Sequence, residues 1–467
     1  MHTMYRKCRL ALAGLAAIAT MTAAAATVTA PASAAATPGP ASLAPAAPCR
    51  GGGQKLSAHP PAPQPGHVAL LWRLARGARL SCYPGQHATP DSIGEPGGYD
   101  PAELQAYLGL HGDGAGQTVA VTIPYDVNEA QAVTTALSVY DSWYGLPPAC
   151  SATITTGCFP LTFAAPHGTA PPPQGLFEAL LAQPEAELDV ELIHALVPRA
   201  SIEVVEGYDD TVTHMLQAVA YAQSLHPAAV SNSWGTPEFS GEQAAGGHCT
   251  ATGSPCVFAT GDSGNYGWCD GQGTGTGEDC GGYPAASPKV LAVGGTTLDL
   301  TDSGKKVQSE TAWSGSGGGI SAYEPFPAYQ QRADSYTTGR GVPDVSFDAD
   351  PNSGIAVYDD QVVTYNGQTV QAHEGWVETG GTSAGAPAWS AILAAADQLR
   401  AAAGQPQLTI GQIHAAAYAK SRKKPVADIT TGTNGLCGAQ CTAGPGYDLV
   451  TGEGSPRHGI DTYLASR

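Results

Sequence analysis

Charged side chains are scarce in this 467-residue chain, at 13% of the residues, and the basic ones are scarcest, with 21 Lys and Arg against 40 Asp and Glu. The net charge of −19 excludes the basic surface on which nucleic-acid binding depends. Beyond the N-terminal region, no apolar run is long enough to cross a bilayer, which argues against an integral membrane protein. We therefore expect no nucleic-acid or membrane partner.

Apolar residues make up 42% of the chain, which also contains 59 glycines and 37 prolines. This composition fits a loop-rich globular protein rather than a coiled coil. From residue 98 onward, short apolar runs alternate with helical patterns. Strands are expected within 117–127, 200–208, 228–235, 256–264 and 289–298, and helices within 98–110, 129–146 and 210–225. This alternation predicts an α/β fold with a mostly parallel sheet and helices on both of its faces, in one large domain over 98–467.

The N-terminal region has the pattern of a secretory signal. Three basic residues within the first nine are followed by an apolar, alanine-rich run and by the small-residue motif Ala32-Ser33-Ala34. We therefore interpret residues 1–34 as a cleaved signal peptide of a secreted protein. The Ala- and Pro-rich residues 35–97 are expected to be a linker or short extension.

The cysteines fit export to an oxidising compartment. Cys8 lies in the signal, and the other ten form five couples that are close in sequence. The couples are Cys49/Cys82, Cys150/Cys158, Cys249/Cys256, Cys269/Cys280 and Cys437/Cys441. An even number of cysteines in a secreted chain favours disulfides, whereas a zinc site would need a CxxC or His-rich pattern that is missing.

Ser383 is a candidate nucleophile. It stands in "GGTSAGAP", after two glycines and a threonine and before a long alanine-rich helical pattern. Such a turn can present a serine hydroxyl at the start of a helix, where the helix dipole favours negative charge. The alternative is that Ser383 merely caps an ordinary helix. A serine nucleophile also requires a base that accepts its proton.

The base is expected on a helix over 184–198, bounded by prolines. At 100° per residue, Glu185 and Asp189 fall in the middle of the apolar face, whereas Glu187, Glu191 and His194 group on the opposite, polar face. Two acids four residues apart lie on one side and can share a proton. Glu185 could then deprotonate Ser383, with Asp189 orienting it.

Asp262 is a candidate oxyanion donor. It lies in "ATGDSG", a glycine-flanked turn directly after an apolar strand. An ionised aspartate would repel an oxyanion, but a protonated one donates a hydrogen bond to it. An aspartate in this role predicts an enzyme that works in acid.

Three other interpretations compete with this one. A subtilisin-type Ser-His-Asp protease could use His167 of "PHGTA", with Asp126 at the end of the first strand, but Pro171–Pro173 preclude the helix that should follow His167. A glycosidase could use Glu185 and Asp189 as its carboxyl pair. The third alternative is a catalytically inactive homologue that binds peptides.

Eight motifs together resemble one family, the sedolisins or serine-carboxyl peptidases. They are "EAELD", "SNSWG", "ATGDSG", "YPAASPKVLAVGGT", "WSGSGGG", "PDVSFDADPNSG", "GGTSAGAP" and "AGPGYDLVTGEG", in the family's order over about residues 98–457. The resemblance implies a subtilisin-like fold, endopeptidase activity on proteins or peptides at acid pH, and Glu185, Asp189, Asp262 and Ser383 as catalytic residues. Residues 35–97 are too short for the family's large prodomain, which puts activation by that route in question. We expect a monomer.

A calcium site is expected near the C-terminus. "VADIT" and "GPGYD" supply Asp428 and Asp448 around a glycine-rich loop whose carbonyl groups can turn inward, and calcium binds carboxylate and carbonyl oxygens. From the residues alone, "GPGYD" could be just a turn. The resemblance implies one structural Ca²⁺ held by Asp428, Ile429, Gly444, Gly446 and Asp448.

Overall fold

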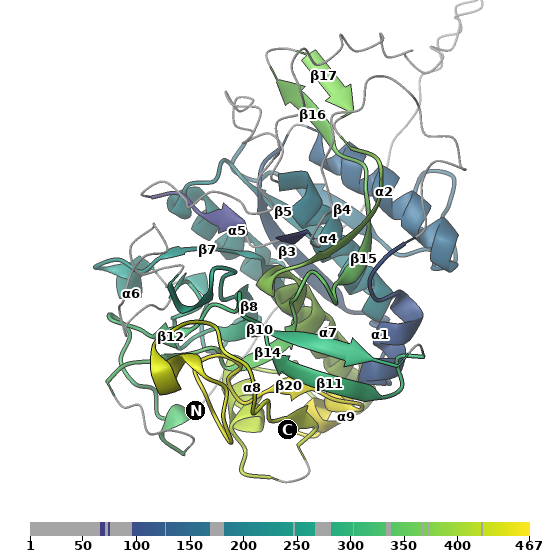
Figure 1. Ribbon diagram of the computed structural model, residues 1–467. Helices are drawn as coiled ribbons and strands as arrows, with labels where there is room; N and C mark the ends of the chain where they lie inside the picture. Colours follow the sequence, from purple (N-terminus) through teal and green to yellow (C-terminus); the bar gives the residue numbers. More distant parts are fainter. Residues whose placement is uncertain are drawn as a thin grey trace, which may run out of the picture. The chain divides into compact units, whose positions relative to one another are not determined.

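The centre of the computed structural model is an eight-stranded sheet (Figure 1). Its strand order is β11 (Val307–Ala312), β10 (Leu291–Leu300), β8 (Cys256–Ala259), β6 (Ala229–Asn232), β3 (Thr118–Pro124), β5 (Ser201–Gly207) and β4 (Leu161–Ala164), and β14 (Val345–Asp348) also pairs with β10. Only the β10–β11 pairing is antiparallel among these strands. The expected α/β fold with a mostly parallel sheet is confirmed.

The structure describes most of the chain beyond its N-terminal region. The described residues are 66–70, 73–74, 96–126, 128–168, 182–245, 248–266, 282–301, 303–332, 338–365, 368–371, 373–421 and 424–467. The expected signal peptide, residues 1–34, lies outside them. Among the described helices, none has the length and apolar character needed to cross a membrane.

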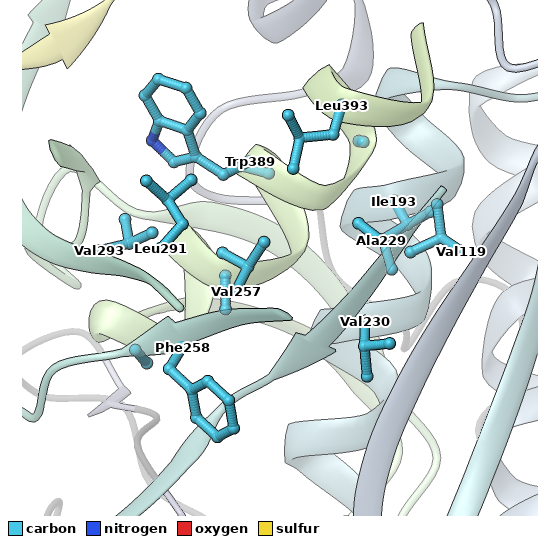
Figure 2. Packing of buried hydrophobic residues seen from close by; sticks show 14 of the residues in the cluster. Val119, Ile193, Ala229, Val230, Val257, Phe258, Leu291, Val293, Trp389 and Leu393 are labelled. Atoms are coloured by element: carbon cyan, nitrogen blue, oxygen red, sulfur yellow. The ribbon is translucent and has the colours of Figure 1, made fainter. Parts of the chain in front are cut away.

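The strands are buried on both faces, as a parallel sheet between helices requires. Figure 2 shows Val257 and Leu291 on the side of the strands next to Trp389, whereas Val230 and Phe258 point to the opposite side. All five side chains are almost completely shielded from solvent. The short Val- and Ala-rich runs therefore form strands because both sides of each run find apolar partners.

Eight α-helices are described: α1 (Pro101–Leu108), α2 (Glu129–Tyr144), α4 (Ala182–Leu196), α5 (Val212–Ser224), α6 (Glu242–Ala245), α7 (Gly385–Ala402), α8 (Ile410–Ala417) and α9 (Ile460–Ala465). Helices α4 and α7 pack against each other and against β3, and α5 packs against β3 and β5. The helices expected within 98–110, 129–146 and 210–225 are confirmed as α1, α2 and α5.

Helix α4 corrects one expectation. The sequence pattern puts Glu187, Glu191 and His194 on a polar face that is expected to be exposed to solvent. In the structure, all fifteen residues of α4 are buried. The reason is that α1, α2, α7, β3 and β15 (Ile355–Asp359) all pack around this helix. Glu187 accepts a hydrogen bond from the backbone N of Asp360 (3.1 Å), and Glu191 accepts one from Tyr358 N (2.9 Å). Burial next to polar partners, rather than solvation, accommodates these acids.

Shorter strands surround the main sheet. They are β1 (Ala69–Leu70), β2 (Arg73–Leu74), β7 (Trp234–Pro237), β9 (Gly282–Tyr283), β12 (Gly319–Ile320), β13 (Gly341–Val342), β16 (Val362–Tyr365), β17 (Gln368–Gln371), β18 (Gly375–Gly380), β19 (Val426–Ala427) and β20 (Ser455–Pro456). Strands β1 and β2, purple in Figure 1, lie within the segment 35–97 that is expected to be a linker or short extension. They pair with β7 and β18, respectively.

Three of the five expected disulfides lie within the described residues, and all three are formed. They are Cys150–Cys158, Cys249–Cys256 and Cys437–Cys441. The couples Cys49/Cys82 and Cys269/Cys280 fall outside the described residues and remain predictions.

Candidate active site

The four expected catalytic residues come from two helix starts and one strand end. Asp262 follows β8, Ser383 lies in the short 3₁₀ helix η5 (Thr382–Ala384) that leads into α7, and Glu185 and Asp189 lie in the first half of α4. Helix α4 packs directly against η5. In parallel α/β sheets, the carboxyl ends of the strands gather with the helix starts at one edge, and this edge commonly holds the active site.

The backbone geometry around η5 explains why glycines flank this short helix on both sides. Gly381 has a φ of +97°, a conformation that L side chains rarely adopt. A Cβ atom on Gly385 would lie 2.5 Å from Val293 Cγ1, so η5 and α7 approach β10 more closely than any side chain would allow. Ser383 is buried, and its Oγ makes no hydrogen bond to a described residue. The backbone of the turn therefore holds Ser383 in place, without a hydrogen bond to Oγ from a described residue.

Asp189 is connected to the Ser383 turn through Ser233. Ser233 Oγ donates to Asp189 Oδ1 (2.7 Å) and lies 3.3 Å from the backbone O of Ser383. Burial raises the pKa of Asp189 well above its ordinary value, and the Ser233 hydrogen bond only partly offsets this effect. Glu185, one turn earlier on the same helix, is equally buried. Both carboxyl groups are thus shielded from water.

Asp262 is held beside Thr382, the residue before Ser383. Its Oδ1 accepts hydrogen bonds from the backbone N and from Oγ1 of Thr382, both at 2.8 Å. Thr382 Oγ1 in turn accepts a hydrogen bond from Gly261 N (3.0 Å). These bonds fasten the turn after β8 to the turn before α7, so the candidate oxyanion donor and the candidate nucleophile are adjacent.

A further buried acid near this edge was not singled out from the sequence. Glu129, the first residue of α2, is completely buried. Burial raises its pKa well above the ordinary value, and the charges of Glu206, Asp126 and Asp189 add to this shift. Several carboxyl groups therefore favour their protonated form here. Glu129 has no local sequence signal beyond its place at a helix start, and Ser233, although it lies in the motif "SNSWG", has none that indicates a contact with Asp189.

The histidine alternative receives no support from this geometry. His167 is exposed, and its Nε2 lies 3.4 Å from the backbone O of Gln217 on α5. Asp126, which would orient such a histidine, accepts hydrogen bonds from Gln183 Nε2 (2.9 Å) and Asn128 N (2.7 Å). The histidine and the aspartate of the alternative Ser-His-Asp arrangement thus have other partners.

The residues expected to bind calcium lie around one loop. Gly446 N donates to Asp428 Oδ2 (2.8 Å), and Gly444 N donates to Asp448 Oδ2 (3.0 Å). Ile429, directly after Asp428, is buried. Within the described ranges, no group of three or more His, Cys, Asp or Glu side chains could hold a metal. A cation here would therefore need backbone carbonyl oxygens in addition to the two carboxylates, which a glycine-rich loop can supply.

Comparisons with known proteins place the chain in a family. The sequence model of the subtilase family matches residues 190–433, a range that contains Asp262 and Ser383 and begins directly after Asp189. Kumamolisin from Bacillus sp. (strain MN-32) is 34% identical over 296 residues, which cover 58% of this chain and 49% of kumamolisin. Sedolisin from Pseudomonas sp. (strain 101) is 33% identical over 218 residues, 44% of this chain and 34% of sedolisin.

The chain thus spans about half or less of the length of these relatives. Among solved structures, Pseudomonas sedolisin, a serine-carboxyl proteinase complexed with two molecules of pseudo-iodotyrostatin, superposes with a TM-score of 0.61 at 25% identity. That match covers 80% of this chain and 100% of the sedolisin chain. With the subtilisin-like sheet and the eight motifs described above, these matches lead to one conclusion. The chain belongs to the subtilase family and, within it, to the kumamolisin-like sedolisins.

Proposed function

We propose that this protein is a secreted, acid-active serine-carboxyl endopeptidase that hydrolyses protein or peptide substrates as a monomer. The observation that carries the proposal is the pair of hydrogen-bonded connections to the Ser383 turn, one from Asp189 through Ser233 and one from Asp262 through Thr382. They support a site in which the buried carboxyl helix and a potential oxyanion donor act on the hydroxyl of the serine in this turn.

In the proposed reaction, Glu185 accepts the proton of Ser383 Oγ while Oγ attacks the carbonyl carbon of the scissile peptide bond. Asp189 orients Glu185 and shares its proton, so the pair acts as one base. The proton then passes to the amine that leaves. Water hydrolyses the acyl-enzyme in the same way and restores Ser383.

The developing oxyanion would be stabilised by protonated Asp262 together with the backbone N–H of Ser383. Because Asp262 must carry a proton to donate, the proposed enzyme is active in acid and loses activity as Asp262 ionises. The start of α7 adds the favourable end of its helix dipole.

A structural calcium ion is part of the proposal. Asp428 and Asp448 would provide carboxylate oxygens, and Ile429, Gly444 and Gly446 would provide carbonyl oxygens. Asp428 precedes the 444–446 loop in the sequence and Asp448 follows it. Each carboxylate accepts a hydrogen bond from a backbone N–H group of this loop. When bound, the ion would clamp the C-terminal loops, with no part in peptide hydrolysis.

The deciding experiment is peptide hydrolysis by three single variants across the acid range. Ser383→Ala should lose activity by several orders of magnitude. Ser390→Ala, on the adjoining helix α7 and equally buried, is the matched control and should retain activity. His167→Ala should also be active. Activity that survives Ser383→Ala, or that depends on His167 and peaks above neutral pH, would refute the proposed mechanism in favour of the histidine alternative or another site.

A further inference from the structure

The turn that carries Asp262 is held on both of its sides. On the N-terminal side, Gly261 N donates to Thr382 Oγ1 (3.0 Å), next to the candidate nucleophile. On the C-terminal side, only Ser263 separates Asp262 from a short 3₁₀ helix, η3 (Gly264–Tyr266). Contacts that hold η3 therefore also limit how the backbone at Asp262 can turn, and with it the direction of the carboxyl group.

Helix η3 is fastened to a loop near the C-terminus, residues 432–443. Asn265 N donates to the backbone O of Asn434 (3.1 Å). Gly264 has a φ of +66°, and a Cβ atom on it would lie 2.3 Å from the same oxygen. The 432–443 loop thus approaches the backbone of η3 more closely than any residue other than glycine would allow. This close approach fixes the position of η3 relative to the loop.

The side chain of Asn265 extends the same contact. It is only 3% exposed, and its Nδ2 lies 2.8 Å from Cys437 Sγ and 3.2 Å from Cys441 Sγ. These two sulfur atoms form one of the three described disulfides. Because sulfur is a weak hydrogen-bond acceptor, we expect this contact to add little to the stability of the fold. Its effect is to set where η3 lies against the disulfide.

The 432–443 loop is itself closed in three ways. Its disulfide joins residues that are four apart, Asn434 N donates to Cys441 O (3.0 Å), and Thr433 pairs with Thr442 in an antiparallel bridge. No residue of this loop carries a charged side chain. The loop therefore offers η3 a rigid and uncharged support, so it can act on Asp262 through position but not through charge.

From these contacts, and resting on the proposed function, we propose that Asn265 is a positioning residue of the oxyanion site and that the Cys437–Cys441 disulfide supports it. The loop holds η3, η3 restrains the turn, and the turn directs the carboxyl group of Asp262 at the oxyanion. Asn265 and the disulfide both act through Asp262, and neither donates to the oxyanion itself. Because the oxyanion develops only in the transition state, loss of this support should lower kcat and leave substrate binding largely unchanged.

Peptide hydrolysis in acid by two variants tests the support. Asn265→Ala removes the amide group, and the double variant Cys437→Ala/Cys441→Ala removes the disulfide. Since misplacement of a catalytic group by about 1 Å can cost a hundredfold in rate, kcat should fall roughly threefold or more in the first and roughly tenfold or more in the second. KM should stay within about twofold of the wild-type value. The control, Cys150→Ala/Cys158→Ala, removes a disulfide next to β4 at the edge of the main sheet and should leave kcat unchanged.

A double-mutant cycle separates positioning from a general loss of structure. In the Asp262→Ala background no carboxyl group is left to direct, so Asn265→Ala should then change kcat by less than about twofold. A loss of structure that does not act through Asp262 would instead multiply with the effect of Asp262→Ala. The Tm of every variant is measured, and kcat is compared at a temperature at which all of them are folded.

The outcomes separate the two proposals. If the wild type hydrolyses the peptide and Asn265→Ala keeps the wild-type kcat, or lowers it equally with and without Asp262, the positioning role is wrong and the proposed function stands. A raised KM with an unchanged kcat would also overturn it, because the loop would then contact the substrate instead. If the disulfide variant does not fold, the cycle with Asn265→Ala decides alone. If the wild type does not hydrolyse the peptide, the proposed function itself fails, and the positioning role with it.

Discussion

Asp262 Oδ1 accepts two hydrogen bonds from Thr382, one from its backbone N and one from its Oγ1, both at 2.8 Å. Thr382 is covalently bonded to Ser383, so these bonds fix the orientation of the Asp262 carboxyl group relative to the candidate nucleophile. Because Oδ1 accepts two donors, a proton on Asp262 is expected on Oδ2. The geometry thus defines which oxygen atom would donate to an oxyanion.

Replacement of Asp262 tests this arrangement directly. In Asp262→Asn, the amide oxygen can take the place of Oδ1 and the NH₂ group can donate without a titratable proton. We expect the variant to retain activity at higher pH than the wild type does. Asp262→Ala should lower kcat about 10²- to 10³-fold, as removal of one oxyanion donor does. Equal pH profiles for Asp262→Asn and the wild type would show that ionisation of Asp262 does not limit the activity.

Ser233 is expected to position Asp189. Ser233→Ala removes the hydroxyl that donates to Asp189 Oδ1 at 2.7 Å. A hydrogen bond to a charged group contributes about 1.5–3 kcal/mol, so kcat should fall roughly 10- to 100-fold. The acid limb of the pH–kcat profile should move upward, because the bond favours ionised Asp189. Ser231→Ala, a buried serine on β6, is the control and should leave the profile unchanged.

Stability should be greatest in acid. Burial, reinforced by Asp126, raises the pKa of Glu206 to about 7, and burial raises the pKa of Asp397 to about 7 against the opposing effects of Leu408 N and Arg400. A raised folded-state pKa means that the folded protein binds these protons more tightly than the unfolded chain. The stabilisation is complete below the unfolded pKa and is lost as pH rises through about 7.

Chemical unfolding measured from acid to slightly alkaline pH checks this expectation. Each group contributes a slope of at most about 1.4 kcal/mol per pH unit to the free energy of unfolding. Asp397→Asn and Glu206→Gln should each make the decline shallower. A free energy of unfolding that increases as pH rises through neutrality would contradict the assignment.

If calcium binds as proposed, the exposed carboxylate of Asp428 stabilises the folded protein by holding the ion. Asp428 is exposed, so Asp428→Asn should cost little unless it removes a metal ligand. We expect this variant to lower the Tm, and a chelator to lower the Tm of the wild type but not that of the variant further. Asp299→Asn, at an exposed acid of β10, is the control. If a chelator leaves the wild-type Tm unchanged and elemental analysis finds no calcium, the ion does not bind.

Local geometry is what the sequence could establish. Glu185 and Asp189 share one side of a helix because helical winding places residues four apart together, whatever surrounds the helix. The disulfides at Cys150–Cys158, Cys249–Cys256 and Cys437–Cys441 were predictable because their sequence separations are only 8, 7 and 4 residues. The strands of the sheet were recognisable as short apolar runs because this pattern, too, lies within a few consecutive residues.

The tertiary structure alone decided what depends on distant partners. Glu187 and Glu191 looked solvated because charge normally marks an exposed helix face, but the elements around α4 leave it no such face. Ser233 is 44 residues from Asp189 and 150 from Ser383, so no local pattern could connect them. The strand at Leu70 looked like part of a linker because a two-residue strand is defined only by the edge with which it pairs, and that edge, at Trp234, is supplied by a distant part of the chain.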